Sequence, residues 1–209
     1  MRRRLEILYK LCIIERMQKT DTLPTLPFES QQSWESWLSE HHASARGVWL
    51  KIAKKEADIA SVSYAEALDV ALCYGWIDGQ KAAFDAQFWL QKFTPRGPKS
   101  IWSKINCDKA EALMADGRMQ SAGLRQVDLA KADGRWNAAY ASQRTIDIPD
   151  DFQRELDANP QAQAFFNTLN SANRYAILFR IQTAKKPETR AERIRKFIAM
   201  LVRGEKIHP

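Results

Sequence analysis

Hydrophobic positions follow two different periods along this chain, and the changes between them predict its elements. Trp34, Trp37 and Leu38 are spaced as on one face of a helix, which we expect Ser33 to cap. In residues 48–53, Val, Leu and Ile alternate with Trp, Lys and Ala, which predicts a strand with one buried face. The chain therefore opens with a helix and a strand in succession.

A second helix and a hairpin are predicted next. Ser63, followed three residues later by Glu66, is typical of a capping box, and Gly75 is expected to end that helix. Alternation resumes over Trp76–Thr94, so we expect two strands joined near Phe84–Ala86. These strands and the earlier one predict a small antiparallel sheet.

Every element predicted after this hairpin is a helix. Asn106 is expected to be an N-cap, and helical spacing continues from there to a final helix that begins at Pro187. We divide the chain into an N-terminal extension (1–24), an α+β domain (25–146) and a helical module with a basic final helix (147–209). The predicted fold class is α+β, with a small antiparallel sheet and helices in the N-terminal part and an all-helical C-terminal module.

The net charge of +7 is unevenly distributed. Residues 1–16 carry +3, residues 180–209 carry +6 and the 163 residues between them carry −2, which sums to +7. A basic tail favours acidic partners, nucleic acid or an anionic lipid surface, and the alternative is a solubilising charged face. The candidate basic residues of the final helix are Arg190, Arg193 and Lys196.

Cysteine and histidine usage argues against a metal site and against a Cys–His or Ser–His nucleophile pair. The three cysteines form no CxxC motif, and the three histidines lie far from the dense polar motifs described below. We therefore expect no metal and no cofactor, and a reducing, cytoplasmic compartment.

The first residues begin like a signal peptide, with three arginines, but Glu6 and Lys10 interrupt the apolar stretch. No cleavage site follows, and the segment is too short and too charged to span a membrane. It is interpreted as an amphipathic helix, a membrane-surface element, or an extension upstream of a start at Met17, with the extension favoured.

Polar side chains concentrate between Gly75 and Asn106, at predicted strand ends and a helix entry. The candidate ligand-binding residues are Asp78, Arg96, Lys99, Ser100, Trp102, Ser103, Lys104 and Asn106. A guanidinium, ammonium groups, hydroxyls and helix N–H groups can together hold a phosphate or carboxylate. The structural alternatives are a turn at Asp78-Gly79, an Arg96–Asp78 salt bridge, helix caps at the serines and Asn106, and buried tryptophans.

One further run, Lys131–Trp136, ends a predicted helix with Asp-Gly-Arg-Trp. We interpret it as a helix C-cap followed by an aromatic anchor rather than as part of a site.

The blocks GWIDG, FTPR, SxWSKxN, AEALMADGRM, AKADGRW and KKPETRAERIRKFIAML occur in this order. Residues from about Leu26 to Gly204 thereby resemble the YdeI/OmpD-associated (OmdA-like) family, also labelled bacteriocin-protection proteins. The resemblance implies a role in resistance to antimicrobial peptides or envelope stress, with a porin partner and a periplasmic address. The signature positions matched are Gly75, Trp76, Asp78, Gly79, Arg96, Trp102, Ser103, Asn106, Arg190 and Arg193.

Three functional hypotheses follow. The first is a non-enzymatic stress-protection protein that binds a small anion or an acidic protein partner. The second is an enzyme in which Asp78 is the general base and Arg96 stabilises developing negative charge. The third is nucleic-acid or membrane-surface binding through residues 180–209. The lack of a histidine or recognisable nucleophile in the 75–106 segment favours binding over catalysis.

Overall fold

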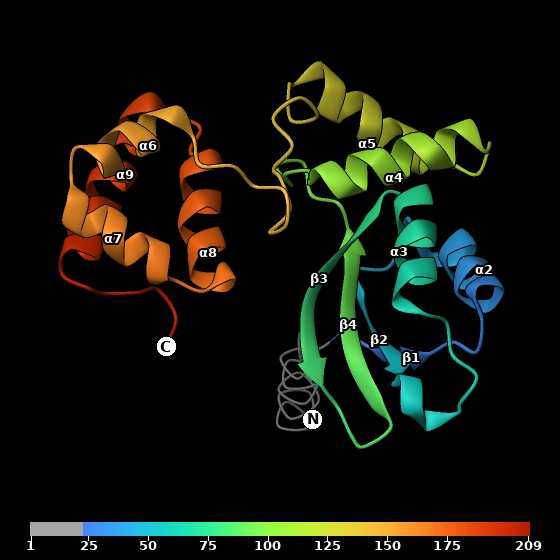
Figure 1. The fold of residues 1–209 in the computed structure, drawn as a ribbon. Coiled ribbons are helices and arrows are strands. Elements are labelled where there is room, and N and C mark those ends of the chain that lie inside the picture. The colour runs from blue at the N-terminus through green and yellow to red at the C-terminus, as the bar shows by residue number, and fades with distance from the viewer. Residues whose placement is uncertain (1–22) are drawn as a thin grey trace, which may run out of the picture. The chain divides into compact units, whose positions relative to one another are not determined.

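The computed structural model describes residues 23–209, and the chain divides into two compact units, 1–96 and 97–209. The first unit holds a four-stranded sheet with the order β1-β2-β4-β3 (Figure 1). Its elements are β1 (Thr25–Pro27), α2 (Gln31–His41), β2 (Val48–Ala53), a short 3-10 turn (Lys55–Ala57), α3 (Tyr64–Cys73), β3 (Trp76–Ala83) and β4 (Phe88–Pro95). The expectations for the N-terminal segment up to residue 22 lie outside the described residues.

The sheet is mixed rather than purely antiparallel. β1 pairs parallel with β2, while β2–β4 and β3–β4 are antiparallel as predicted. The parallel strand comes from residues 25–27, which lie between Pro24 and the end of a Pro-rich lead-in and therefore give no alternation signal of their own.

One face of the sheet packs under α2 and α3 (Figure 1). Val48, Leu50 and Ile52 of β2 are buried, at 0, 0 and 3% exposure, and the residues between them are half-buried. On the helix side, Trp34 is fully buried and its ring centroid lies 5.7 Å from that of Phe93. The alternation predicted for this strand therefore separates a core face from a more open one.

Two helix caps show how far a local signal identifies the cap residue. The predicted capping box of α3 is confirmed, since Ser63 N–H donates to Glu66 Oε2 (2.9 Å) and Glu66 N–H donates to Ser63 Oγ (3.3 Å). The prediction for α2 was wrong by one turn, because Ser30 is its N-cap and accepts from Ser33 N–H at 3.2 Å. Ser33 Oγ in turn accepts from Ser30 N–H at 3.2 Å, so the two serines form one reciprocal box.

Helices make up the regular structure of the second unit. They are α4 (Lys104–Ala115), α5 (Ser121–Ala132), α6 (Asp150–Asp157), α7 (Pro160–Thr168), α8 (Ser171–Gln182) and α9 (Pro187–Val202). The predicted cap of α4 was wrong, because Ser103 is the N-cap and Asn106 lies buried in the first turn. A Ser three residues before an Asn offers two cap candidates, and the helix begins at the earlier one.

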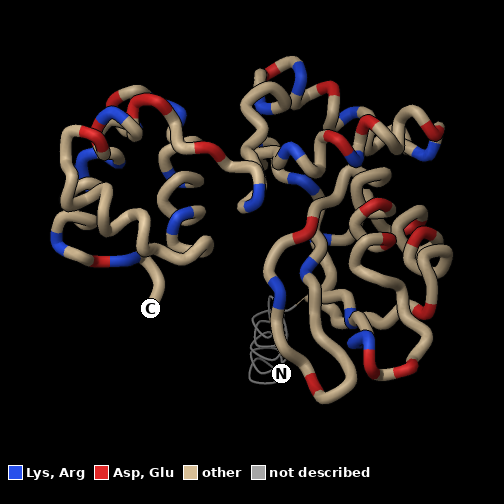
Figure 2. The backbone as a smooth tube through the Cα atoms, in the orientation of Figure 1, with Lys and Arg blue, Asp and Glu red and all other residues tan. Residues whose placement is uncertain are grey.

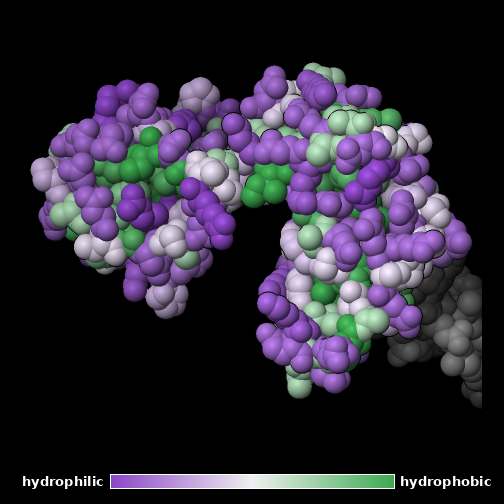
Figure 3. Space-filling model, turned by 45° about the vertical axis from the view of Figure 1, so that its right-hand side comes forward, coloured by the Kyte–Doolittle hydropathy of each residue, from purple (hydrophilic) through white to green (hydrophobic). Residues whose placement is uncertain are grey.

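Helices α6 to α9 share a core of their own. Phe152, Phe166, Ile177, Ile181 and Leu201 are each fully buried within it. Charged residues of both signs are spread along these helices (Figure 2), and hydrophilic residues surround the hydrophobic ones that show on the visible face (Figure 3). The predicted α+β class and the all-helical C-terminal part are thereby confirmed. Among residues 23–209, no helix has the length and apolar character needed to cross a bilayer.

Candidate functional site

The first unit contains two of the predicted site residues, Asp78 and Arg96. Asp78 lies in β3 and accepts a hydrogen bond from the Tyr64 hydroxyl at 2.9 Å. Arg96 follows β4, is 5% exposed, and its backbone N–H donates to the Gly75 carbonyl at 3.0 Å. Neighbouring Trp76 is buried and donates from Nε1 to the His42 carbonyl at 3.1 Å, as expected for a core tryptophan. Asp78 thus already has a hydrogen-bond donor from α3.

The remaining residues of the predicted segment lie in the second unit, and several of them hold its backbone in place. Ser100 Oγ accepts from Gly97 N–H at 3.1 Å, and Ser103 Oγ accepts from Asn106 N–H at 3.1 Å. Trp102 is 2% exposed, so its ring belongs to the core. The two lysines of the segment, Lys99 and Lys104, are exposed. Of the alternatives foreseen, the helix cap at Ser103 and the buried ring of Trp102 are therefore present, whereas Ser100 holds the turn over residues 97–100.

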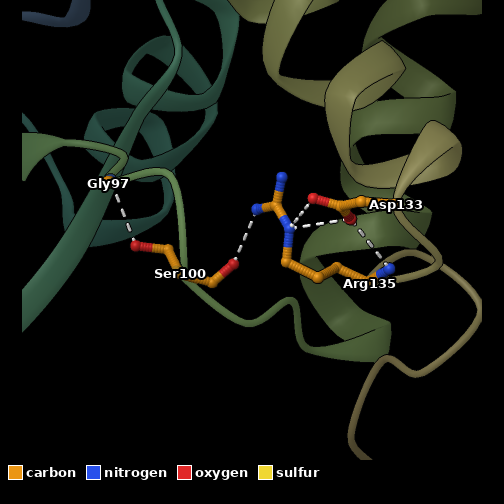
Figure 4. Close-up of polar contacts among 4 residues, drawn as sticks. All are labelled: Gly97, Ser100, Asp133 and Arg135. Atoms are coloured by element: carbon orange, nitrogen blue, oxygen red, sulfur yellow. Dashed lines mark hydrogen bonds and ion pairs between the residues drawn. The ribbon is translucent and has the colours of Figure 1, made fainter.

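Arg135, which the sequence analysis did not count among the site residues, lies beside this segment. Helix α5 ends at Ala132, and Gly134, with φ of +79°, turns the chain so that Arg135 points back toward the residue 100 segment (Figure 4). Arg135 Nε donates to both carboxylate oxygens of Asp133, at 2.9 and 2.7 Å, and Nη1 donates to the Ser100 carbonyl at 2.9 Å. Three contacts therefore fix the orientation of this side chain.

The electrostatics of the pair follow from these contacts. The hydrogen bond from Arg135 is the main cause that lowers the pKa of Asp133, and the charges of Arg135 and Lys185 lower it further. Asp133 is therefore ionised at neutral pH and holds the guanidinium without removing its positive charge. Within the described part of the chain, Nη2 of Arg135 makes no hydrogen bond.

Residues 138–141 follow this loop in the chain, and Tyr140 among them contacts α8. Tyr140 N–H donates to the Trp102 carbonyl (3.0 Å), and Lys104 N–H donates to the Tyr140 carbonyl (2.9 Å). The Tyr140 ring packs edge-on against Phe179 of α8, with centroids 4.9 Å apart. Tyr140 is thereby fixed on both sides by contacts within the second unit.

A cavity of about 370 Å³ opens between these elements. Its walls come from the residue 101 segment, the loop after α5 and the end of α8. The lining residues are Ile101, Asp133, Gly134, Arg135, Ala138, Tyr140, Gln182, Thr183, Ala184 and Lys185. Its volume falls in the small-molecule range of roughly 300–1,000 Å³. We call it the Arg135 cavity.

The chemistry of the Arg135 cavity suits a small anion. Arg135 and Lys185 supply two positive charges against the one carboxylate of Asp133. An arginine fork recognises carboxylate and phosphate oxygens through parallel N–H groups, and Gln182 and Thr183 are further polar residues of the lining. Across residues 23–209, no cluster of three or more His, Cys, Asp and Glu side chains could hold a metal.

The basic residues predicted for α9 are engaged to different degrees. Arg190 donates from Nε and Nη2 to Asp151 of α6, at 2.6 and 2.8 Å, and from Nη1 to the Ile181 carbonyl at 2.9 Å. Arg193 donates to the Arg180 carbonyl, and Lys196 is exposed. Arg190 therefore contributes to helix packing.

Arg135 illustrates what sequence reasoning missed. The predicted C-cap and aromatic anchor are confirmed, since Asp133 is the C-cap and Trp136 packs on Trp102 with centroids 4.9 Å apart. The contact that positions the arginine between them could not be read from the local sequence, because its partner Ser100 is 35 residues away. A charged residue directly after a helix-ending glycine was the only local hint.

Comparison with known families assigns the two ends of the chain differently. Residues 145–204 match the family described as bacteriocin-protection, YdeI or OmpD-associated, and residues 26–126 match a domain of unknown function (DUF8412). No curated protein and no solved structure matches the chain. The Arg135 loop lies between the two matched segments, whereas residues 182–185 of the cavity wall lie within the second.

Proposed function

We propose that this protein binds a small carboxylate or phosphate in the Arg135 cavity and that its protective role depends on this binding. Its residues 145–204 match the family described as bacteriocin-protection, YdeI or OmpD-associated. The observation behind this proposal is a guanidinium that is held in place by Asp133 and the Ser100 carbonyl while Nη2 makes no hydrogen bond within the described chain.

A held arginine binds an anion at lower entropic cost than a mobile one. A long side chain that is ordered on binding loses roughly 0.5–1.5 kcal/mol of rotamer freedom. The contacts to Asp133 and Ser100 order Arg135 before any ligand arrives, and its side chain is only 10% exposed. Partial exclusion from water also strengthens each charge-assisted hydrogen bond that it makes.

The segment predicted from the sequence takes part through its backbone. Ser100 supplies the carbonyl that positions the guanidinium, and Ile101 lines the cavity. Lys99 and Lys104 stay candidates for attracting an anion within the same unit. Asp78 and Arg96 stay a separate proposal for the first unit, and the Tyr64 hydroxyl bonded to Asp78 supports binding there more than general-base catalysis.

Calorimetric titration of the full chain with inorganic phosphate, acetate and benzoate tests the proposal. Benzoate adds an apolar ring to the carboxylate and probes the cavity volume. The variant Arg135→Lys keeps the charge but loses the planar fork. Because a hydrogen bond to a charged group contributes about 1.5–3 kcal/mol, we expect the variant to bind at least one of these anions about 10- to 100-fold more weakly.

Arg203→Lys is the matched control, because Arg203 forms a forked pair with Glu205 on the exposed surface of the same unit. It should bind as the parent does. Equal affinities for the parent and Arg135→Lys, or no binding of any of the three anions, would contradict the proposal.

A further inference from the structure

The sheet of the first unit has a second face, opposite α2 and α3, which we call the outer face. Its register places Trp49 across from Lys92, Lys51 across from Leu90, and Ala53 across from Phe88. These residues are half-buried, and along β2 they alternate with the buried core positions Val48, Leu50 and Ile52. Among the described residues, the two helices of this unit lie on the other side of the sheet (Figure 1).

Lysines and aromatic rings are interleaved on the outer face. Lys51 Nζ lies 4.0 Å from the centroid of the Phe88 ring and 4.7 Å from that of Phe84. Lys92 Nζ lies 5.9 Å from the centroid of Trp49. Phe84, at the hairpin end, is 49% exposed. Each of these rings on the face therefore has an ammonium group over it.

The charged strand residues of the outer face are all positive. Strands β2, β3 and β4 together carry Lys51, Lys81 and Lys92 but only one carboxylate, Asp78 (Figure 2). Asp78 pairs in register with the buried Phe93 and bonds to Tyr64 of α3, so it belongs to the helix side. Among the described strand residues, the outer face thus has lysines and no carboxylate.

We propose that the outer face binds single-stranded nucleic acid, with bases stacked on the aromatic rings and phosphates held by Lys51 and Lys92. Flat rings accept any base, and ammonium groups neutralise the backbone, which is the combination found in general single-strand binding. A duplex hides its base faces and gains only the charge contacts. An acidic protein would likewise use the lysines but not the ring faces.

The distances between the rings suit an extended strand. Phe88 is paired with Ala53, four residues along β2 from Trp49, which is about 13 Å at the usual rise of roughly 3.3 Å per residue. Lys51 lies between these two ends of the face, and Lys92 lies across from Trp49 at one of them. A strand that stacks one base at each end therefore passes its phosphates over both ammonium groups. Base stacking on a ring is stronger than an exposed lysine–ring contact, so a base can displace each lysine toward a phosphate.

Fluorescence anisotropy of the full chain with a labelled oligodeoxythymidine of about ten nucleotides tests this inference. We expect binding tighter than to a duplex of the same length or to polyglutamate. With two phosphates neutralised, the logarithm of the binding constant should fall with the logarithm of salt concentration with a slope of about −1.4. The double variant Lys51→Gln/Lys92→Gln should remove most of this slope, and Trp49→Leu should weaken binding about tenfold.

Lys81→Gln is the matched control. Lys81 also lies over a ring, with Nζ 4.3 Å from the Trp89 centroid, but it pairs with the buried Gln91 on the helix side of the sheet. It should bind the oligonucleotide as the parent does. Two results would overturn the proposal: equal binding by the Lys51→Gln/Lys92→Gln variant, whose changes spare the core, or equally tight binding of duplex or polyglutamate, which would make the face a general polyanion or protein surface.

Discussion

Arg190 should stabilise the C-terminal helices far more than a neighbouring arginine on the same helix. It reaches from α9 to Asp151 on α6 and to the Ile181 carbonyl at the end of α8. Arg195, five residues further along α9, has Glu192 of its own helix as its only ion-pair partner among residues 23–209, and the two side chains are 74 and 64% exposed. Replacing each arginine by alanine therefore compares an interhelical contact with a local one.

The contacts set the expected size of the effect. The Arg190 and Asp151 side chains are 27 and 34% exposed, so solvent screening reduces their forked pair to about 1 kcal/mol. The bond to the Ile181 carbonyl adds about another 1 kcal/mol. Arg190→Ala should therefore destabilise these helices by about 2 kcal/mol. Asp151→Ala should cost about half as much, and Arg195→Ala less than about 0.5 kcal/mol.

Hydrogen exchange read by mass spectrometry on peptides from residues 187–202 measures this locally. Tryptophan fluorescence would not, because α6 to α9 contain no tryptophan. A loss of 2 kcal/mol corresponds to roughly 30-fold faster exchange from the opened state, against about twofold for Arg195→Ala. If Arg190→Ala exchanged no faster than Arg195→Ala, the packing role of Arg190 would be refuted.

Three other predictions concern stability. First, hydrogen bonds from Arg190 are the main cause that lowers the pKa of Asp151. The stability that they give is therefore present above the ordinary aspartate pKa of about 4 and is lost as pH falls through the lowered value. In Asp151→Asn, an acid titration of unfolding followed by circular dichroism should lack this step. Second, Gly47→Ala should destabilise the first unit by about 3 kcal/mol in urea unfolding, because φ is +147° and the new Cβ would lie 3.0 Å from the Phe93 carbonyl oxygen. Gly134→Ala should cost only about 1 kcal/mol, because φ is +79° and the new Cβ would meet open space. Ser103→Ala removes the N-cap of α4 and should cost about 1 kcal/mol, measured in the same way, and an unchanged midpoint would show that the cap adds nothing.

Local signals identified most of the elements in advance. The Ser63–Glu66 box needs only four consecutive residues, and the alternation in β2 needs six, so both were predictable. Where two candidate caps lie three residues apart, as with Ser30 and Ser33, the sequence leaves the choice open. The parallel pairing of β1 depends on contacts with a strand more than 20 residues away, which no local pattern encodes.

The candidate site was harder to predict for the same physical reason. Ser100 was singled out for its hydroxyl, yet it contributes its backbone carbonyl to the cavity region. Arg135 and Lys185 lie 50 residues apart, and both line the cavity. An arginine that follows a helix end is not distinctive in a sequence. Only the folded chain shows that Arg135 is fixed beside an open cavity.

The most direct test of the central claim is the side-chain Nε–Hε NMR signal of Arg135 in the full chain during titration with inorganic phosphate and benzoate. Binding in the Arg135 cavity predicts a saturable shift of this signal, while the signal of Arg203, paired with Glu205 at the surface, stays in place. An Arg135 signal that does not move, or that moves linearly together with Arg203, would show that the cavity does not bind these anions.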